Sequence, residues 1–223
     1  MVFRHEFKHE ITEHDFIVLK SKLSCALIPD NNGDNGKYKI RSLYFDNIYD
    51  SALREKVDGV NHREKFRIRS YDGDANFIRL EKKSKINGLT NKISARISAE
   101  QVQKIIDGDI EFMKDSPEAL VRELYLKMHT KALLPKTLVD YTRQAYTHPA
   151  GNVRITLDYD IKTGLSCYDF LNNECVTVTA GEKVAILEVK WDEFLPDFVR
   201  DLVQIKTLHS SAFSKYAACR VYG

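Results

Sequence analysis

The chain has 223 residues, 43% of them apolar, which is enough for one large domain or two small ones and for a sizeable core. Although 30% of the residues are charged, the formal net charge is only +2, which excludes a uniformly basic surface of the kind that attracts polyanions. No apolar run is long enough to span a membrane, and the N-terminus lacks the apolar core of a signal peptide. The four cysteines show no C-x-x-C spacing, so no zinc site is expected. We therefore expect a cytoplasmic protein with reduced cysteines and a single domain over residues 1–223.

Strands and turns dominate the first part of the chain. A strand is expected over residues 3–11, followed by a helix that runs to about Ala26 with Thr12 as its N-cap. Further strands are expected over residues 38–45, 64–71, 77–85 and 91–97. The dipeptides Asp72-Gly73 and Asn87-Gly88 favour tight hairpin turns between these strands.

Helices and strands mix in the remainder. Ser98 with Gln101 is typical of a capping box and predicts a short helix to about Ile106. Ser116 followed by Pro117 predicts a helix that runs to about Lys131. Strands are expected over residues 138–146, 152–159 and 185–191, a helix over 196–207, and residues 210–220 close the chain. This order predicts an α+β fold, and about eight antiparallel strands are enough to form a β-barrel with the helices packed outside.

Charged residues recur at every second position of many expected strands and therefore share one face of each strand. Arg67 and Arg69 alternate with Phe66 and Ile68, for example, and acids are interspersed among the bases. The alternating polar set comprises Arg4, Glu6 and Lys8; Arg63, Lys65, Arg67 and Arg69; Arg79, Glu81 and Lys83; Tyr141 and Arg143; Arg154, Thr156, Asp158 and Asp160; Glu188 and Lys190. Lys82 falls on the opposite face and is expected to be solvated.

Two arrangements of these faces are consistent with the pattern. The charged faces can lie in water over an apolar core, as in many half-buried antiparallel sheets. Alternatively, the amphipathic helices cover the apolar faces from outside, and the charged residues line the interior. Buried charges are costly unless they are paired or have counter-ions, so this second arrangement requires a bound anion together with a metal ion.

Several motifs resemble the VTC domain, the polyphosphate polymerase branch of the triphosphate tunnel metalloenzymes in the CYTH-like superfamily. They follow one another in order over essentially the whole chain. The motifs are Arg4-His-Glu6-Phe-Lys8, Ser42-Leu-Tyr-Phe-Asp46-Asn47, Tyr49-x4-Arg54-x-Lys56, Phe66-Arg67-Ile68-Arg69-Ser-Tyr71, Leu80-Glu81-Lys82-Lys83, Asp140-Tyr-Thr-Arg143, Val153-Arg154-Ile-Thr-Leu-Asp158, Ile186-Leu-Glu188-Val-Lys190 and Phe213-Ser214-Lys215-Tyr216. Arg4 replaces the first acid of the E-x-E-x-K pattern found in other tunnel enzymes, and this replacement is typical of the VTC branch.

The resemblance implies a tunnel in which basic residues bind a phosphate chain and acids bind Mn²⁺ or Mg²⁺. The implied phosphate-binding residues are Lys8, Arg54, Lys56, Arg67, Arg69, Lys83, Lys92, Arg143, Arg154, Lys190 and Lys215. Glu188 is the strongest implied metal ligand, whereas Glu6, Glu81 and Asp158 could instead hold basic neighbours in place. The implied catalytic residues are Lys8, Arg67, Arg69 and Glu188.

The function that the resemblance implies is metal-dependent transfer of the terminal phosphate of ATP onto a polyphosphate chain. The same site could instead hydrolyse inorganic triphosphate, or the chain could be a non-catalytic module that binds polyphosphate or nucleotides. Arginine suits this role because its guanidinium forms bidentate contacts with phosphate oxygens. The expected partners are ATP or another triphosphate and inorganic polyphosphate, with no nucleic acid and no insertion into a membrane.

Overall fold

The computed structural model describes residues 4–87, 89–165, 167–180, 185–204 and 214–221. Its centre is one antiparallel sheet in which eight strands follow the order β1-β10-β8-β7-β3-β4-β5-β6. These strands are β1 (His5–Ile11), β3 (Lys37–Asp46), β4 (Arg63–Tyr71), β5 (Ile78–Ile86), β6 (Leu89–Ile97), β7 (Leu134–His148), β8 (Val153–Thr163) and β10 (Ala185–Trp191). Two short strands extend the sheet: β2 (Ile28–Pro29) pairs with β7, and β9 (Val178–Thr179) pairs with β8.

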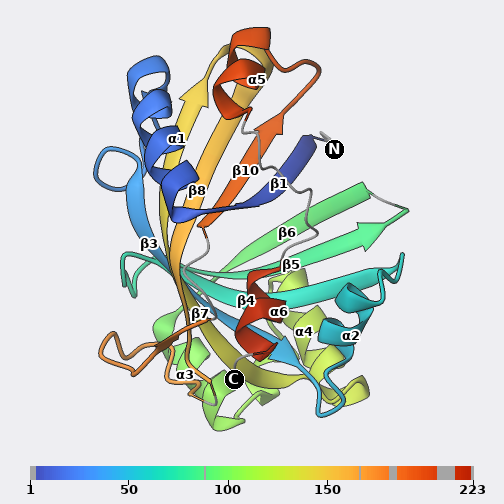
Figure 1. The fold of residues 1–223 in the computed structure, drawn as a ribbon. Coiled ribbons are helices and arrows are strands. Elements are labelled where there is room, and N and C mark those ends of the chain that lie inside the picture. Colours follow the sequence, from blue (N-terminus) through green and yellow to red (C-terminus); the bar gives the residue numbers. More distant parts are fainter. Residues whose placement is uncertain (1–3, 88, 166, 181–184, 205–213, 222–223) are drawn as a thin grey trace.

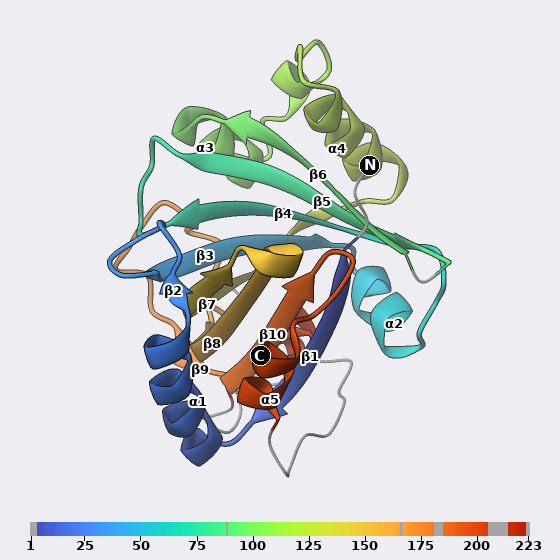
Figure 2. The same cartoon turned by 90° about the horizontal axis from the view of Figure 1, so that it is seen from above.

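The sheet curls strongly into a half-barrel, as Figures 1 and 2 show. Antiparallel strands twist relative to their neighbours, and β-bulges add local bending. The register shifts between Tyr44 and Phe45 in the β3–β7 pair, and between Asp140 and Thr142 in the β7–β8 pair. The expected eight-stranded antiparallel architecture is therefore confirmed. Its two outer strands, β1 and β6, do not pair with each other through the described residues.

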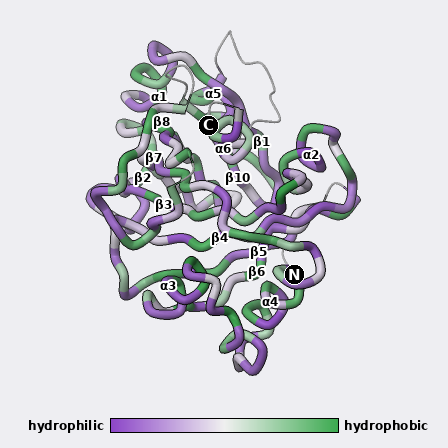
Figure 3. Tube along the Cα trace, turned by 90° about the horizontal axis from the view of Figure 1, so that it is seen from below, coloured by the Kyte–Doolittle hydropathy of each residue, from purple (hydrophilic) through white to green (hydrophobic). Residues whose placement is uncertain are grey.

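Four helices cover the convex side of the sheet (Figure 2). The helices α3 (Ala99–Asp107) and α4 (Ala119–Thr130) contribute to one apolar core with β4, β5 and β6. The helices α1 (Glu13–Ala26) and α5 (Asp197–Val203) contribute to a second core with β8 and β10. Hydrophobic and hydrophilic residues are interleaved along the chain in Figure 3, as the alternation predicts. The apolar faces thus lie under the helices, and the arrangement with charged faces in open water is wrong.

The helices α2 (Ser51–Val57) and α6 (Lys215–Val221) pack against each other, and the sequence did not predict α2. The carboxylate of Asp46 accepts hydrogen bonds from the backbone N–H groups of Ala52 (2.9 Å) and Leu53 (3.1 Å), which stabilises the first turn of α2. The hydroxyl of Tyr216 on α6 donates to the same carboxylate at 2.6 Å. One buried acid at the end of β3 therefore links both helices to the sheet.

Most expected boundaries agree with the structure. The Thr12 cap and the Ser98–Gln101 capping box are both present. The helix expected from Pro117 begins later, at Ala119, because the Ser116 hydroxyl accepts from the N–H of Glu118 in the preceding turn. Two short 3₁₀ helices also occur, at Glu111–Met113 and Ala150–Asn152. Parts of the expected elements at residues 3, 88, 205–207 and 210–213 lie outside the described residues.

The cysteines and the helices were also subjects of the initial expectations. In the loop after β8 the sulfur atoms of Cys167 and Cys175 lie close together, while Cys25 and Cys219 are free thiols. None of the helices within the described part of the chain is long and apolar enough to cross a membrane.

Candidate functional site

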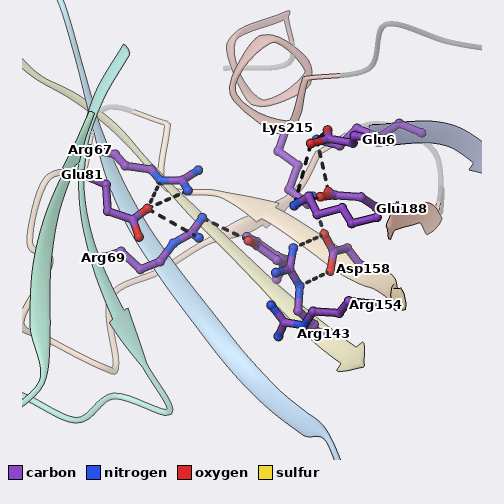
Figure 4. A network of polar contacts seen from close by, with 12 residues as sticks. Glu6, Arg67, Arg69, Glu81, Arg143, Arg154, Asp158, Glu188 and Lys215 are labelled. Atoms are coloured by element: carbon purple, nitrogen blue, oxygen red, sulfur yellow. Dashed lines mark hydrogen bonds and ion pairs between the residues drawn. The ribbon is translucent and has the colours of Figure 1, made fainter. Parts of the chain in front are cut away.

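The concave face of the sheet gathers charged side chains into two facing groups (Figure 4). The arginine wall, on β4, β5 and β6, consists of Arg67, Arg69, Glu81, Lys83 and Lys92. The carboxylate wall, on β1, β10, β8 and β7, consists of Glu6, Lys8, Arg143, Arg154, Asp158, Glu188 and Lys190, with Lys215 added from α6. Strand register sets the neighbours, because it places Arg67 opposite Glu81 and Glu188 opposite Lys8.

In the arginine wall, three cations surround one acid. The Nε atom of Arg67 donates to the Glu81 carboxylate at 2.7 Å, Arg69 lies 3.7 Å from the same oxygen, and Lys92 contacts the other oxygen. Burial would raise the pKa of Glu81, but Arg67, Arg69 and Lys92 outweigh it and lower that pKa to about 2. Glu81 is therefore ionised at neutral pH, and the wall retains excess positive charge.

Hydroxyl groups hold the two arginines in position. Arg67 also donates to the hydroxyl of Tyr44 at 3.0 Å. Arg69 donates to the hydroxyls of Ser42 and Tyr141, both at 3.1 Å. Tyr141 belongs to β7, so its contact with Arg69 connects the arginine wall with the carboxylate wall. The guanidinium planes are thus oriented by fixed partners on neighbouring strands.

The centre of the carboxylate wall is a pair of acids that share two ammonium groups. The Nζ atom of Lys8 lies 2.9 Å from Glu6 and 3.1 Å from Glu188. Lys190 contacts both carboxylates as well. Burial would raise the pKa of Glu188, but Lys8 and Lys190 hold it well below its usual value. Burial would lower the pKa of Lys8, but Glu188 and Glu6 raise it, so both Lys8 and Glu188 are charged.

Asp158 occupies a different position in the carboxylate wall. Its two oxygens accept hydrogen bonds from Arg143 at 2.7 and 2.8 Å, and Lys215 lies 2.5 Å from one of them. Asp158 is fully buried, and burial would raise its pKa, but Arg143 and Lys215 lower it. Asp158 and Glu81 therefore each form hydrogen bonds with an arginine of the concave face and an ion pair with a lysine.

The curl of the sheet brings Lys83 of the arginine wall close to charged residues of the carboxylate wall. Lys83 lies on β5, yet the charges that act on it include Lys8, Glu6 and Glu188 from the opposite wall. Although solvent still reaches its side chain, the surrounding walls remove part of its hydration; this desolvation and the nearby Lys8 lower its pKa to about 8. The far end of the arginine wall thus faces the two acids, Glu6 and Glu188.

Some expected residues lie outside this network. Arg54 and Lys56 are on α2. The electrostatic interactions of Lys56 with Arg63 and Lys85, at the ends of β4 and β5, are stronger than its interaction with Lys8 of the carboxylate wall. Arg154 faces the concave side but is held by Asp30 at 2.5 Å and by the hydroxyl of Tyr38 at 2.9 Å. Lys82 points to the convex side as expected, but it is not solvated, because it pairs with Glu123 on α4 at 2.5 Å.

Sequence reasoning placed Tyr141 on the charged face but did not predict that tyrosines hold the arginines in position. Tyr38, Tyr44 and Tyr141 each accept a hydrogen bond from an arginine of the concave face. Tyr38 and Tyr44 share the parity of Ser42 within one strand, and this alternation was the available signal. Lys65 was placed on the charged face, and its Nζ atom lies 5.0 Å from the centre of the Tyr216 ring. The contact depends on α6, so no local pattern predicted it.

The oxygen donors suit a hard cation in only part of the site. No group of three or more His, Cys, Asp or Glu side chains suited to a metal occurs among the described residues. Glu6 and Glu188 are the two ionised carboxylates that share their neighbours, and divalent Mg²⁺ or Mn²⁺ commonly uses one or two carboxylates together with phosphate oxygens. The pair therefore fits such an ion.

Comparisons with known proteins concern the fold and the family of the chain. The putative adenylate cyclase from Bacillus halodurans has a similar fold, with a TM-score of 0.54, 13% identity, and coverage of 90% of this chain and 86% of that chain. The PH1012 protein from Pyrococcus horikoshii OT3 gives a TM-score of 0.49 at 11% identity, with coverage of 93% and 95%. No curated protein matches this chain. The model of the VTC domain matches residues 3–222, nearly the whole sequence, and the chain belongs to the VTC domain family.

Proposed function

We propose that this protein is a metal-dependent phosphotransferase that moves the terminal phosphate of ATP onto a polyphosphate chain. The excess of cations over carboxylates on a concave, partly buried face carries the proposal. The two walls contain more cations than acids, and every acid already has cationic partners, so positive charge remains uncompensated. A chain of phosphates can supply the missing negative charge over the length of the face, which a single phosphate cannot.

Glu188 is the proposed metal ligand, with Glu6 beside it. In the protein alone, Lys8 and Lys190 lie against both carboxylates, so this position already favours positive charge. Bound there, Mn²⁺ or Mg²⁺ supplies charge neutralisation and polarisation of phosphate oxygens. Glu81 and Asp158 are less suitable, since each holds an arginine of the face in place: Glu81 accepts from Arg67, and Asp158 accepts from Arg143 through both oxygens.

The remaining residues position the phosphates. Phosphoryl transfer mainly requires the reacting groups to be held in line and their charge to be stabilised. We propose that Arg67, Arg69 and Arg143 bind phosphate oxygens through guanidinium N–H groups, since carboxylates and hydroxyls already fix their orientation. Lys8 lies between the two acids and is proposed to act closest to the transferred phosphate.

The test is incubation of the pure protein with ATP and Mn²⁺, followed by separation of the products by chain length. We expect ADP and an acid-labile polymer, and we expect neither with the Glu188→Gln variant. Release of orthophosphate from triphosphate without polymer would identify a triphosphatase instead. Tight binding of triphosphate with no product from any nucleotide would identify a non-catalytic binding module.

A further inference from the structure

Thr156 on β8 carries a buried hydroxyl for which the described residues provide no hydrogen-bond partner. The residue is only 4% exposed. Within the described part of the chain, three other buried side-chain atoms also lack a hydrogen bond, but they belong to Glu81, Asp192 and Arg220, each of which forms an ion pair. Other buried hydroxyls have partners: Arg69 donates to the hydroxyl of Ser42, and the hydroxyl of Thr163 donates to the carbonyl of Cys219. A buried hydroxyl without a partner is unfavourable and calls for an explanation.

The position of Thr156 in the sheet explains the hydroxyl without a partner. Its β8 neighbours Ile155 and Leu157 belong to the apolar core on the convex side, so Thr156 faces the concave side between Arg154 and Asp158. The register places it directly opposite Glu188 on β10 and opposite Ala145 on β7. Side chains paired in this way have Cβ atoms about 4.5–5.5 Å apart, within reach of a hydrogen bond. Ala145 offers no polar group, which leaves Glu188 as the cross-strand polar neighbour.

Glu188 turns its oxygens toward lysines in the protein alone. Lys8 approaches one oxygen at 3.1 Å, and Lys190 contacts the other. A carboxylate that binds a metal ion commonly needs a further hydrogen bond that fixes its orientation. A cation that displaces these ammonium groups would leave Glu188 without its present donors, while the hydroxyl beside it is free to donate.

We propose that Thr156 is a positioning residue for Glu188, and that its hydroxyl donates a hydrogen bond to the Glu188 carboxylate when a divalent cation displaces Lys8 and Lys190. This inference rests on the proposed function, because it requires Glu188 to be the metal ligand. It assigns a role to a side chain that does not itself touch the phosphates. It also explains why a buried hydroxyl without a partner occupies this position.

The test measures Mn²⁺ binding to the full chain by the electron paramagnetic resonance signal of free Mn²⁺. We expect Thr156→Val, which keeps the branched shape, to weaken Mn²⁺ binding about tenfold or more, as loss of an outer hydrogen bond to a metal ligand typically does. Thr156→Ser should restore affinity to within about threefold, because it keeps the hydroxyl. Thr147→Val is the matched control, since Thr147 lies on the neighbouring strand and pairs with Arg154 rather than with Thr156.

Two further measurements separate positioning from a structural role. Tripolyphosphate affinity without metal should be the same for Thr156→Val and the wild type. The melting temperature of Thr156→Val should equal or exceed that of the wild type, because a methyl group replaces a hydroxyl without a partner. A lower melting temperature together with weaker binding of both ligands would overturn the inference and indicate a packing role.

The remaining outcomes distinguish this inference from the proposed function. If Glu188→Gln abolishes Mn²⁺ binding but Thr156→Val binds like the wild type, only the inference about Thr156 is overturned. Equal losses in Thr156→Val and Thr156→Ser would also overturn it, since the hydroxyl would then be irrelevant. If Glu188→Gln retains wild-type Mn²⁺ affinity, the metal assignment fails and the inference fails with it.

Discussion

The arginine wall and the carboxylate wall use the same kinds of residues in different proportions. In the arginine wall, Arg67, Arg69 and Lys92 share the single acid Glu81. In the carboxylate wall, Glu6, Glu188 and Asp158 are balanced by lysines and by Arg143. The difference separates two tasks: excess positive charge favours anions, whereas paired acids favour a metal ion.

The two walls do not act as independent surfaces, because residues from both meet at Tyr141. Arg69 donates to its hydroxyl at 3.1 Å, and Lys215 from α6 lies 4.6 Å from the centre of its ring. Lys83 faces the acids from the other side. A phosphate chain on the arginine wall would therefore extend toward the two carboxylates. This arrangement suits binding on one wall and chemistry at the other.

The largest effect on binding is expected from the arginine wall. Replacement of Arg67 and Arg69 by Ala should cost about 3–6 kcal/mol of tripolyphosphate binding, since hydrogen bonds to charged groups contribute about 1.5–3 kcal/mol each. Isothermal titration calorimetry measures the loss. Glu81→Gln should be added to the double variant, because the buried acid would otherwise lose most of its partners.

A matched control is available on the convex side. Lys20 on α1 is exposed, and Lys20→Ala lowers the net charge by one, as the triple variant Arg67→Ala, Arg69→Ala, Glu81→Gln does. If this control weakens binding as much as the arginine variant does, general charge rather than the arginine wall is responsible. The arginine wall would then not be a specific site for anions.

The second effect concerns the carboxylate wall. Glu188→Gln should reduce turnover of ATP at least about a hundredfold, because loss of electrostatic stabilisation at a reacting group typically costs about 10²–10³. Tripolyphosphate binding without metal should change much less, since the arginine wall is intact. Steady-state rates and calorimetry on the same preparation measure both. Wild-type turnover of this variant in Mn²⁺ would move the metal to other carboxylates.

A smaller, pH-dependent effect should connect the two walls. The pKa of Lys83 is lowered to about 8, by partial loss of hydration between the walls and then by Lys8. It therefore loses its positive charge as pH rises from 7 to 9. The pKa of Tyr44 is also lowered to about 8: burial opposes the shift, but Arg67 and Arg69 outweigh it, so a negative charge forms over the same range. Both changes weaken anion binding at higher pH.

Comparison with Lys83→Met isolates the lysine from the titration of Tyr44 and of the ligand itself. At pH 7 the wild type should bind tripolyphosphate about tenfold more tightly than the variant, in line with one charge-assisted contact. That advantage should shrink as pH rises through 8. A constant ratio between pH 7 and 9 would show that Lys83 does not meet the ligand.

The smallest effect on binding is expected from α6. Tyr216→Phe removes the 2.6 Å hydrogen bond to Asp46 and should lower the free energy of unfolding by about 1.5–3 kcal/mol. Tripolyphosphate affinity should be nearly unchanged, since the ring still stacks on Tyr44. Urea denaturation measures the stability change. Tyr146→Phe, which removes a buried tyrosine hydroxyl on the convex side, is the control for affinity. A large loss of affinity would instead make Tyr216 part of the binding surface.

The sequence predicted the features that depend on local periodicity. Alternation placed Arg67, Glu81 and Glu188 on one face, and the apolar residues between them lie under helices as expected. Local capping signals at Thr12 and Ser98 also agree with the structure. These features follow from the two-residue repeat of a strand and from backbone donors at helix starts, which neighbouring residues determine.

The sequence could not predict features that depend on distant contacts. The helix α2 begins where Asp46 from the preceding strand accepts its N–H groups, and this carboxylate also binds Tyr216, 170 residues away. The pairing of Lys82 with Glu123 depends on how α4 packs on β5. Lys83 faces Glu6 and Glu188 only because the sheet curls, and curl depends on twist and bulges along the whole sheet.

The proposal that the arginine wall binds phosphates and the carboxylate wall binds the metal ion is tested most directly by a crystal structure with tripolyphosphate and Mn²⁺. We expect phosphate oxygens on Arg67, Arg69 and Arg143, and the metal ion on Glu188 with Glu6 beside it. Phosphates bound on the convex side, or a metal ion on Glu81 with Glu188 still paired to Lys8 and Lys190, would contradict the account.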